Sequence, residues 1–169
     1  MGGSANNYDY VNADPINSLD LTGEKPGGGG KPSNPDYTGG LFGDLLKIEI
    51  RERAKAALDA PKVMESSRNQ DRNGFTRAGR AAQKRSDRNP TGGWPEPAGK
   101  KNPAAWNPVG EKLLETMLNN PDKQAFLSRG NIGGRYNDCI DVRMPDGTGY
   151  RTDMDGNFEA FLEKYQGPS

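Results

Sequence analysis

Nine basic side chains gather in the middle of this chain, between residues 68 and 101. They are Arg68, Arg72, Arg77, Arg80, Lys84, Arg85, Arg88, Lys100 and Lys101, and only three acidic residues stand among them. Guanidinium groups bind phosphate oxygens through two parallel hydrogen bonds, so this cluster is a candidate phosphate-binding surface. Arg80 and Lys84 are four residues apart and would share one face of a helix. The alternative is that the basic residues form a solvated helix face.

The chain contains no histidine, and its one cysteine is Cys139. The lack of histidine excludes a Ser-His-Asp triad, a His-ligated metal and paired-histidine ribonuclease chemistry. A single cysteine excludes an internal disulfide and a multi-cysteine zinc site. Any catalysis must rest on Arg, Lys, Asp, Glu, Tyr, Ser or Thr, and we expect neither a metal ion nor a cofactor.

Helical spacing predicts the elements that would hold the basic residues. Apolar residues recur with that spacing over 41–60, where Pro61 marks the stop, and a second helix is expected over about 76–85, where Thr76 could cap. A third helix is expected over about 109–119, with an apolar stripe of Leu113, Leu114, Met117 and Leu118 that would lie in the core. These three helices precede the remaining elements in the chain.

After Gly133 the pattern changes to that of strands. Strands are predicted over 139–142, from 150 to about 152 and over 158–162, and the pairs Asp146-Gly147 and Asp155-Gly156 mark tight turns between them. Helices followed by an antiparallel meander indicate an α+β fold, in which N-terminal helices pack on a small C-terminal sheet.

The composition argues against one compact domain of all 169 residues. Only 31% of the residues are hydrophobic, and 23 Gly and 13 Pro make up about a fifth of the chain. Residues 24–40 are rich in Gly and Pro, so we predict a flexible linker there and a compact region that begins near Leu41. No apolar run approaches the roughly 20 residues that span a bilayer.

Residues 7–23 read NYDYVNADPINSLDLTG. This stretch resembles the closing motif of the Rhs/YD-repeat core, although Leu21 stands where that family usually has proline and Ala13 where it often has asparagine. The resemblance implies that residues 1–23 are a remnant of the motif that closes an Rhs shell. It also implies that residues 41–169 form a toxin region, because a toxin usually follows this motif.

A second resemblance lies in the C-terminal part. The segments TRAGRAAQK (76–84), NPAAWN (102–107), IDVRMPDGTGYR (140–151) and DGNFEAFL (155–162) resemble a C-terminal toxin module of polymorphic toxins. That module is similar to small ribonucleases of the barnase, EndoU, colicin and RelE type, and we place its compact catalytic part at residues 68–166. Arg85 departs from the pattern, which has histidine at this position.

The resemblance implies a metal-independent ribonuclease toxin that acts on tRNA or other RNA. Such a toxin is secreted or delivered from the producing cell on an Rhs carrier, acts in the cytoplasm of the target cell and is neutralised by a dedicated immunity protein. RNA cleavage by a 2′-hydroxyl needs a base, a proton donor and cations that stabilise the phosphorane. The expected catalytic residues are Lys84, Arg85, Asp141, Arg143 and Arg151, with Asp141 or Asp146 as the base.

Substrate binding is expected from arginines that grip phosphates and from aromatic rings that stack on extruded bases. The expected binding residues are Arg80, Arg88, Asp146 and Tyr150, with Tyr136 and Trp94 as further stacking candidates. Asp146 and Trp94 also have structural interpretations, as a turn residue and as a packing residue in a proline-rich loop.

Two other functions are compatible with the sequence. An ADP-ribosyltransferase toxin would need an arginine near a strand start and a downstream glutamate, for which Arg135 with Glu159 or Glu163 gives a partial match. A non-enzymatic fragment that binds nucleic acid or an immunity protein would need only the basic surface. Cleavage of tRNA, consumption of NAD, and binding without either would distinguish the three.

Overall fold

The computed structural model describes residues 41–164, with side chains from Lys47 onward. The elements are α1 (Leu41–Leu58), α2 (Ala60–Ser67), the 3₁₀ turn η2 (Arg72–Gly74), α3 (Arg77–Arg88), α4 (Pro103–Leu118), β1 (Gln124–Ile132), β2 (Arg135–Arg143), β3 (Gly149–Thr152) and β4 (Phe158–Leu162). The expected Rhs motif at 1–23, the expected linker at 24–40 and the last five residues lie outside the described residues.

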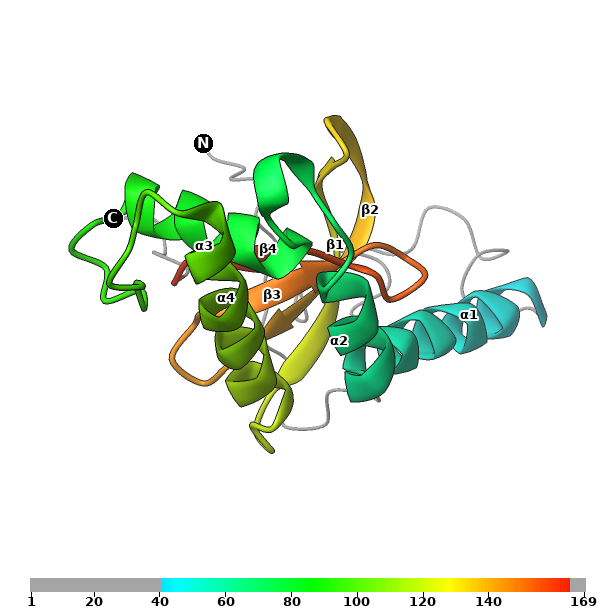
Figure 1. The fold of residues 1–169 in the computed structure, drawn as a ribbon. Coiled ribbons are helices and arrows are strands. Elements are labelled where there is room, and N and C mark those ends of the chain that lie inside the picture. The colour runs from blue at the N-terminus through cyan, green and yellow to red at the C-terminus, as the bar shows by residue number, and fades with distance from the viewer. Residues whose placement is uncertain (1–40, 165–169) are drawn as a thin grey trace, which may run out of the picture.

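The four strands form one antiparallel sheet in the order β1-β2-β3-β4, so each strand pairs with its neighbour in sequence. Figure 1 shows α4 crossing in front of the sheet, α3 running close to β4, and α1 projecting away from the other helices. Helices first and a meander last confirm the predicted α+β fold.

All three predicted helices differ from the observed helices at one end or both. The helix expected over 41–60 ends at Leu58, and an unpredicted helix, α2, follows at once. Pro61, the expected stop, lies in the first turn of α2, where the missing N–H of a proline costs nothing. Asp59 caps this helix by accepting a hydrogen bond from the Lys62 N–H at 3.3 Å. The helix expected from Val109 begins six residues earlier because Asn102 caps it and Pro103 opens it.

Thr76 caps α3 as predicted, since its hydroxyl accepts a hydrogen bond from the Gly79 N–H at 3.1 Å. The helix continues to Arg88, three residues beyond the predicted end.

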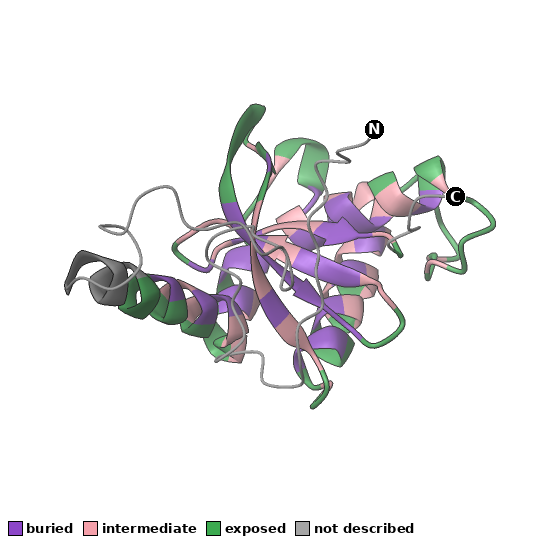
Figure 2. Ribbon diagram, turned by 180° about the vertical axis from the view of Figure 1, so that it is seen from behind, coloured by how far each residue is buried: buried purple, intermediate pink, exposed green. Residues whose placement is uncertain are grey.

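The sheet contains one strand that the sequence analysis did not predict. β1 pairs with β2 along nine residues, from Gln124↔Arg143 to Ile132↔Arg135, and the predicted strand at 139–142 is the inner half of β2. The outer half of this hairpin is polar and exposed, as its green tip in Figure 2 shows, so it lacks the apolar signal of a core strand. The strands 150–152 and 158–162 are confirmed within one residue.

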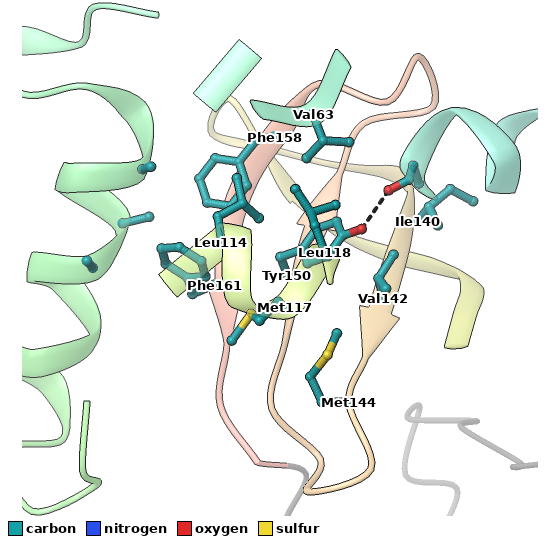
Figure 3. Close-up of a cluster of buried hydrophobic side chains, with 14 of the residues drawn as sticks. Val63, Leu114, Met117, Leu118, Ile140, Val142, Met144, Tyr150, Phe158 and Phe161 are labelled. Atoms are coloured by element: carbon teal, nitrogen blue, oxygen red, sulfur yellow. Dashed lines mark hydrogen bonds between the residues drawn. The ribbon is translucent and has the colours of Figure 1, made fainter. Parts of the chain in front are cut away.

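The core lies between the sheet and the helices. Figure 3 shows Val63 of α2, Leu114 of α4 and the strand residues Tyr150, Phe158 and Phe161 packed together, and all five are completely buried. Phe158 and Phe161 meet edge to face with ring centroids 5.0 Å apart. Leu114, Met117 and Leu118 of the predicted apolar stripe are buried and Leu113 packs against them, which confirms the stripe.

Two glycines allow α3 and α4 to approach at backbone contact. A Cβ on Gly110 would clash with the carbonyl of Ala78, and a Cβ on Gly79 would clash with Asn107. The Asn107 side chain accepts from the Thr76 N–H at 2.8 Å, so the start of α3 is fixed to α4. This contact holds α3, and with it the basic side chains of this helix, at a defined position against α4.

Candidate active site

The twelve residues of α3 divide into a packed face and a cationic face. Ala78, Gly79, Ala81, Ala82 and Ser86 are buried against α4 and β4. The basic side chains at positions 77, 80, 84 and 88 recur at spacings of three and four, which places them along one side of the helix. A helix of small residues on one face and long cations on the other can lie close to a strand and still present its charges.

The cationic face of α3 borders a hollow of about 770 Å³, which we call the α3–β4 cleft. Seven basic side chains line it, namely Arg72, Arg77, Arg80, Lys84, Arg85, Arg88 and Arg151. Among the described side chains, from Lys47 to Lys164, the acidic lining residues are Asp71 and Glu159. Part of its rim is formed by Asn131, Gly133 and Gly134 from the tip of the β1–β2 hairpin, so elements far apart in the sequence build one site.

Glu159 enters the cleft because the pairing of β3 with β4 is irregular. Arg151 pairs with Ala160 and Thr152 with Phe158, which leaves Glu159 as an extra residue in a β-bulge. Its side chain is 19% exposed, and the Arg77 Nη1 lies 3.4 Å from its Oε1. Burial raises the pKa of Glu159; Arg77 opposes this shift, and Asp153 adds to it.

Asp141 fixes the orientation of the Arg151 side chain. The Arg151 Nε and Nη2 donate to the two carboxylate oxygens of Asp141 at 2.6 and 2.9 Å, and Asp141 is fully buried. A Cβ on Gly130 would clash with the Arg151 guanidinium, so this glycine makes room for it. Asp141 does not line the cleft and cannot reach a substrate there directly.

Lys84 is the lysine that lines the cleft, and it lies on the exposed face of α3. Partial burial lowers the pKa of its ammonium group below the ordinary 10.5, and the neighbouring Arg80 lowers it further, against the opposing effect of Asp71. Arg80 is 3.3 Å from Asp71 through its Nε. An ammonium group among guanidinium groups gives up its proton more readily than an isolated one.

Arg85, which stands where the resembling pattern has histidine, has a structural contact. Its Nε donates to the Phe161 carbonyl at 2.6 Å, and its Nη1 lies 3.1 Å from Glu163. These bonds join the end of α3 to the end of β4. Arg85 lines the cleft, but its Nε is engaged with the β4 backbone.

Besides Asp141, three more expected site residues lie outside the cleft. Tyr150 is 0% exposed and its hydroxyl donates to the Ala57 carbonyl at 2.7 Å, the dashed bond in Figure 3, which corrects the expectation of a ring that stacks on a base. Asp146 does not line the cleft and accepts from the Thr148 N–H and hydroxyl in the β2–β3 turn. Arg143 is buried and donates to the Gly147 carbonyl at 2.9 Å.

The exposed end of the β1–β2 hairpin carries an aromatic ring. Tyr136 is 63% exposed, and the Arg129 guanidinium lies over its ring, 5.4 Å from the centroid. Trp94, the other stacking candidate, is partly buried with its ring 6.4 Å from Phe161. Tyr136 therefore offers an exposed ring near the cleft rim, whereas Trp94 packs on the core.

A comparison with protein families decides what this basic cleft belongs to. The family model described as the CdiA C-terminal tRNase toxin domain matches residues 64–163, more than half of the chain. The chain belongs to this family. The CdiA-type tRNase toxins act in contact-dependent inhibition between bacteria, are delivered into target cells and cleave tRNA. The match covers the last residues of α2, all of α3 and α4 and the whole sheet, but not α1.

No curated protein and no solved structure matches the chain. Within residues 41–164 no helix is long and apolar enough to cross a membrane. In the same part of the chain, no group of three or more Cys, Asp or Glu side chains could hold a metal ion.

Of the nine expected site residues, the structure brings Arg80, Lys84, Arg85, Arg88 and Arg151 together in the cleft of this tRNase domain. Sequence reasoning placed Arg72 and Arg77 in the basic cluster but not among the expected site residues, did not propose Asp71 and weighed Glu159 only for another activity. Arg77 could have been found from its spacing to Arg80 and Lys84. Glu159 could not, because its place in the cleft depends on the register of β3 with β4, which the order of residues does not give.

Proposed function

We propose that this domain cleaves tRNA in the α3–β4 cleft, without a metal ion, and that its lining cations bind the RNA backbone. The observation that carries this proposal is the charge of the cleft, with seven cationic side chains against two carboxylates. The tRNA backbone carries one negative charge per nucleotide. A concave cationic surface attracts this backbone and raises the local concentration of tRNA.

The division of tasks follows from the contacts of each cation. Lys84 and Arg88 are exposed at the cleft and are proposed to bind phosphates, together with Arg80. Arg151 is held by both oxygens of Asp141, which fixes the orientation of its guanidinium group at the cleft and allows its positive charge to stabilise a phosphorane. Arg143, Asp146 and Tyr150 are left out of the proposed site because they do not line the cleft.

Metal-independent cleavage is supported by the same charges. Seven cationic side chains would repel a divalent cation, and guanidinium and ammonium groups can stabilise the charge that a metal ion would otherwise neutralise. Family membership also favours RNA cleavage over the ADP-ribosyltransferase and non-enzymatic alternatives.

The carrier and the inhibitor are also part of the proposal. The motif at residues 7–23 supports an Rhs-type carrier, from which the domain is released to act in the cytoplasm of the target cell. A dedicated immunity protein is proposed to neutralise it, with an acidic surface that covers the basic cleft.

The test is incubation of the domain with total tRNA in excess EDTA, with and without NAD. We expect discrete tRNA fragments at the same rate with and without the chelator and no consumption of NAD. Loss of cleavage in EDTA, restored by a divalent cation, would refute the metal-independent mechanism. Consumption of NAD without tRNA fragments would favour the ADP-ribosyltransferase.

A further inference from the structure

We propose that Glu159 is the general base of the cleavage reaction and that Lys84 protonates the leaving group. This inference rests on the proposed cleavage of tRNA in the α3–β4 cleft and assigns two roles that the sequence analysis gave to other residues or left open. The starting observation is the position of Glu159, one of the two carboxylates that line the cleft with seven cationic side chains.

Glu159 is held where a base is needed. Arg77 donates to the Phe158 carbonyl at 3.3 Å and to Glu159 at 3.4 Å, so a single guanidinium fixes both the β4 backbone and the carboxylate beside it. The bulge turns Glu159 toward the cleft while its neighbours Phe158 and Phe161 stay in the core. A carboxylate that is held by one partner and borders a hollow can accept a proton from a bound hydroxyl.

The other carboxylates near the cleft are less suitable. Asp141 binds Arg151 through both oxygens and does not line the cleft. Asp71, the second acidic lining residue, caps η2 by accepting from the Arg72 N–H at 2.7 Å and lies 3.3 Å from Arg80. Asp71 is thus engaged at the start of the 3₁₀ turn, whereas the base must be free to take up a proton.

The groups around Glu159 determine when it can act. Arg77 of α3 favours its ionised form, Asp153 of the β3–β4 turn disfavours it, and partial burial raises its pKa. The cations Arg80, Lys84 and Arg151 line the same cleft. A base with a raised pKa and an acid with a lowered pKa exchange protons at a smaller cost near neutral pH.

The reaction balances with these two residues alone. The Glu159 carboxylate takes the proton of the ribose 2′-hydroxyl, and the 2′ oxygen forms a bond to phosphorus. The bond between phosphorus and the 5′ oxygen breaks, and the Lys84 ammonium group gives that oxygen its proton. The products are a 2′,3′-cyclic phosphate and a 5′-hydroxyl, and Glu159 and Lys84 then return to their starting states by exchange with water.

The experiment measures single-turnover cleavage of total tRNA and, separately, tRNA binding by Glu159→Gln, Glu159→Asp and a matched control. The control is Glu111→Gln, since Glu111 also pairs with one arginine, Arg68 at 3.1 Å, but lies on α4 outside the cleft. We expect Glu159→Gln to lose about 10²- to 10⁴-fold in rate with binding unchanged or tighter. Glu159→Asp should retain an intermediate rate, and Glu111→Gln the full rate.

Two further readouts distinguish a base from a structural residue. The wild-type rate should rise through a pKa above the ordinary 4.5 of a glutamate, because burial raises it, and this limb should be absent in Glu159→Gln. The rate should fall again below pH 10.5 as Lys84 loses its proton. The fragments should end in 2′,3′-cyclic phosphate.

Wild-type rates in folded Glu159→Gln, a slower Glu159→Asp than Glu159→Gln, or fragments with 3′-hydroxyl ends would each overturn this assignment while tRNA cleavage stands. If Glu159→Gln does not fold, the ranking of Glu159→Asp against wild type and the pH profile decide. No cleavage by the wild-type domain would remove the proposed function and this assignment together.

Discussion

The α3–β4 cleft and the β2–β3 turn both contain arginines, but the two regions use them differently. In the cleft, Lys84 and Arg88 face a hollow and are exposed. At the turn, Arg143 donates to the carbonyls of Gly147 and Glu163 at 2.9 and 2.6 Å and is 7% exposed. The groups that an arginine contacts, rather than its presence, therefore separate a binding role from a structural one. Backbone carbonyls fix the guanidinium, whereas an open hollow leaves N–H groups for a ligand.

The largest expected effect is on activity, from reversing charges in the cleft. The double variant Arg80→Glu, Lys84→Glu should lower tRNA cleavage by about 100-fold or more, because both side chains become repulsive to phosphate and the proton donor at position 84 is lost. The melting temperature should change little, since partly exposed charges contribute little to stability. A cleavage assay and a thermal melt measure both. A large loss of stability would show that these side chains are structural.

The second effect is on stability, at the turn. Arg143→Ala should lower the free energy of unfolding by about 1–3 kcal/mol, because it removes a buried side chain and leaves two partly buried carbonyl groups without their donor. The folded variant should cleave tRNA at the wild-type rate. Urea denaturation measures the first, and a rate normalised to folded protein the second. A normal stability with a slow rate would instead place Arg143 in the catalytic site.

Arg85 combines the two kinds of contact, because it lines the cleft and also bonds to the backbone of β4. Replacing it by histidine restores the residue of the resembling pattern, yet the bonds to Phe161 and Glu163 would be lost. We expect Arg85→His to lose about 1–2 kcal/mol of stability and to gain no activity. Arg88→His is the control for stability, since Arg88 is exposed. A large increase in cleavage by Arg85→His would show that this copy is an impaired histidine-dependent enzyme.

The smallest effect is expected at the hairpin. Tyr136→Ala should weaken tRNA binding by about 1 kcal/mol, roughly fivefold, because an exposed ring can stack on one unpaired base. Tyr136→Trp should restore binding. Ile48→Ala is a control, since Ile48 is also an exposed apolar residue but lies on α1. Equal binding by all four proteins would limit the RNA contact to the cleft.

The sequence predicted those elements that carry a local signal. The cap at Thr76, the apolar stripe on α4 and the turns at Asp146 and Asp155 depend on neighbouring residues, and each was found. The missed elements depend on distant ones. β1 is stabilised by its pairing with β2, and α2 has in its first turn Pro61, the residue expected to end the preceding helix.

The site shows the same limit. Arg80, Lys84 and Arg88 share a helix face that spacing alone predicts, and the structure places all three in the cleft. The pairing of Arg151 with Asp141 depends on strand register, and the position of Glu159 depends on a bulge. Neither register nor bulge is visible in the order of residues, so the sequence alone does not place Asp141 outside the cleft and Glu159 in it.

The uneven charge of the chain has a consequence for how fast the toxin meets its substrate. The net charge is zero, so no overall attraction draws RNA toward the molecule. The cleft instead gathers seven cationic side chains against two carboxylates, so the local field there is positive although the whole chain is neutral. Such a local field attracts an approaching polyanion to the cleft and accelerates productive encounters at low ionic strength. Raising the salt concentration then slows association more than it changes the chemical step.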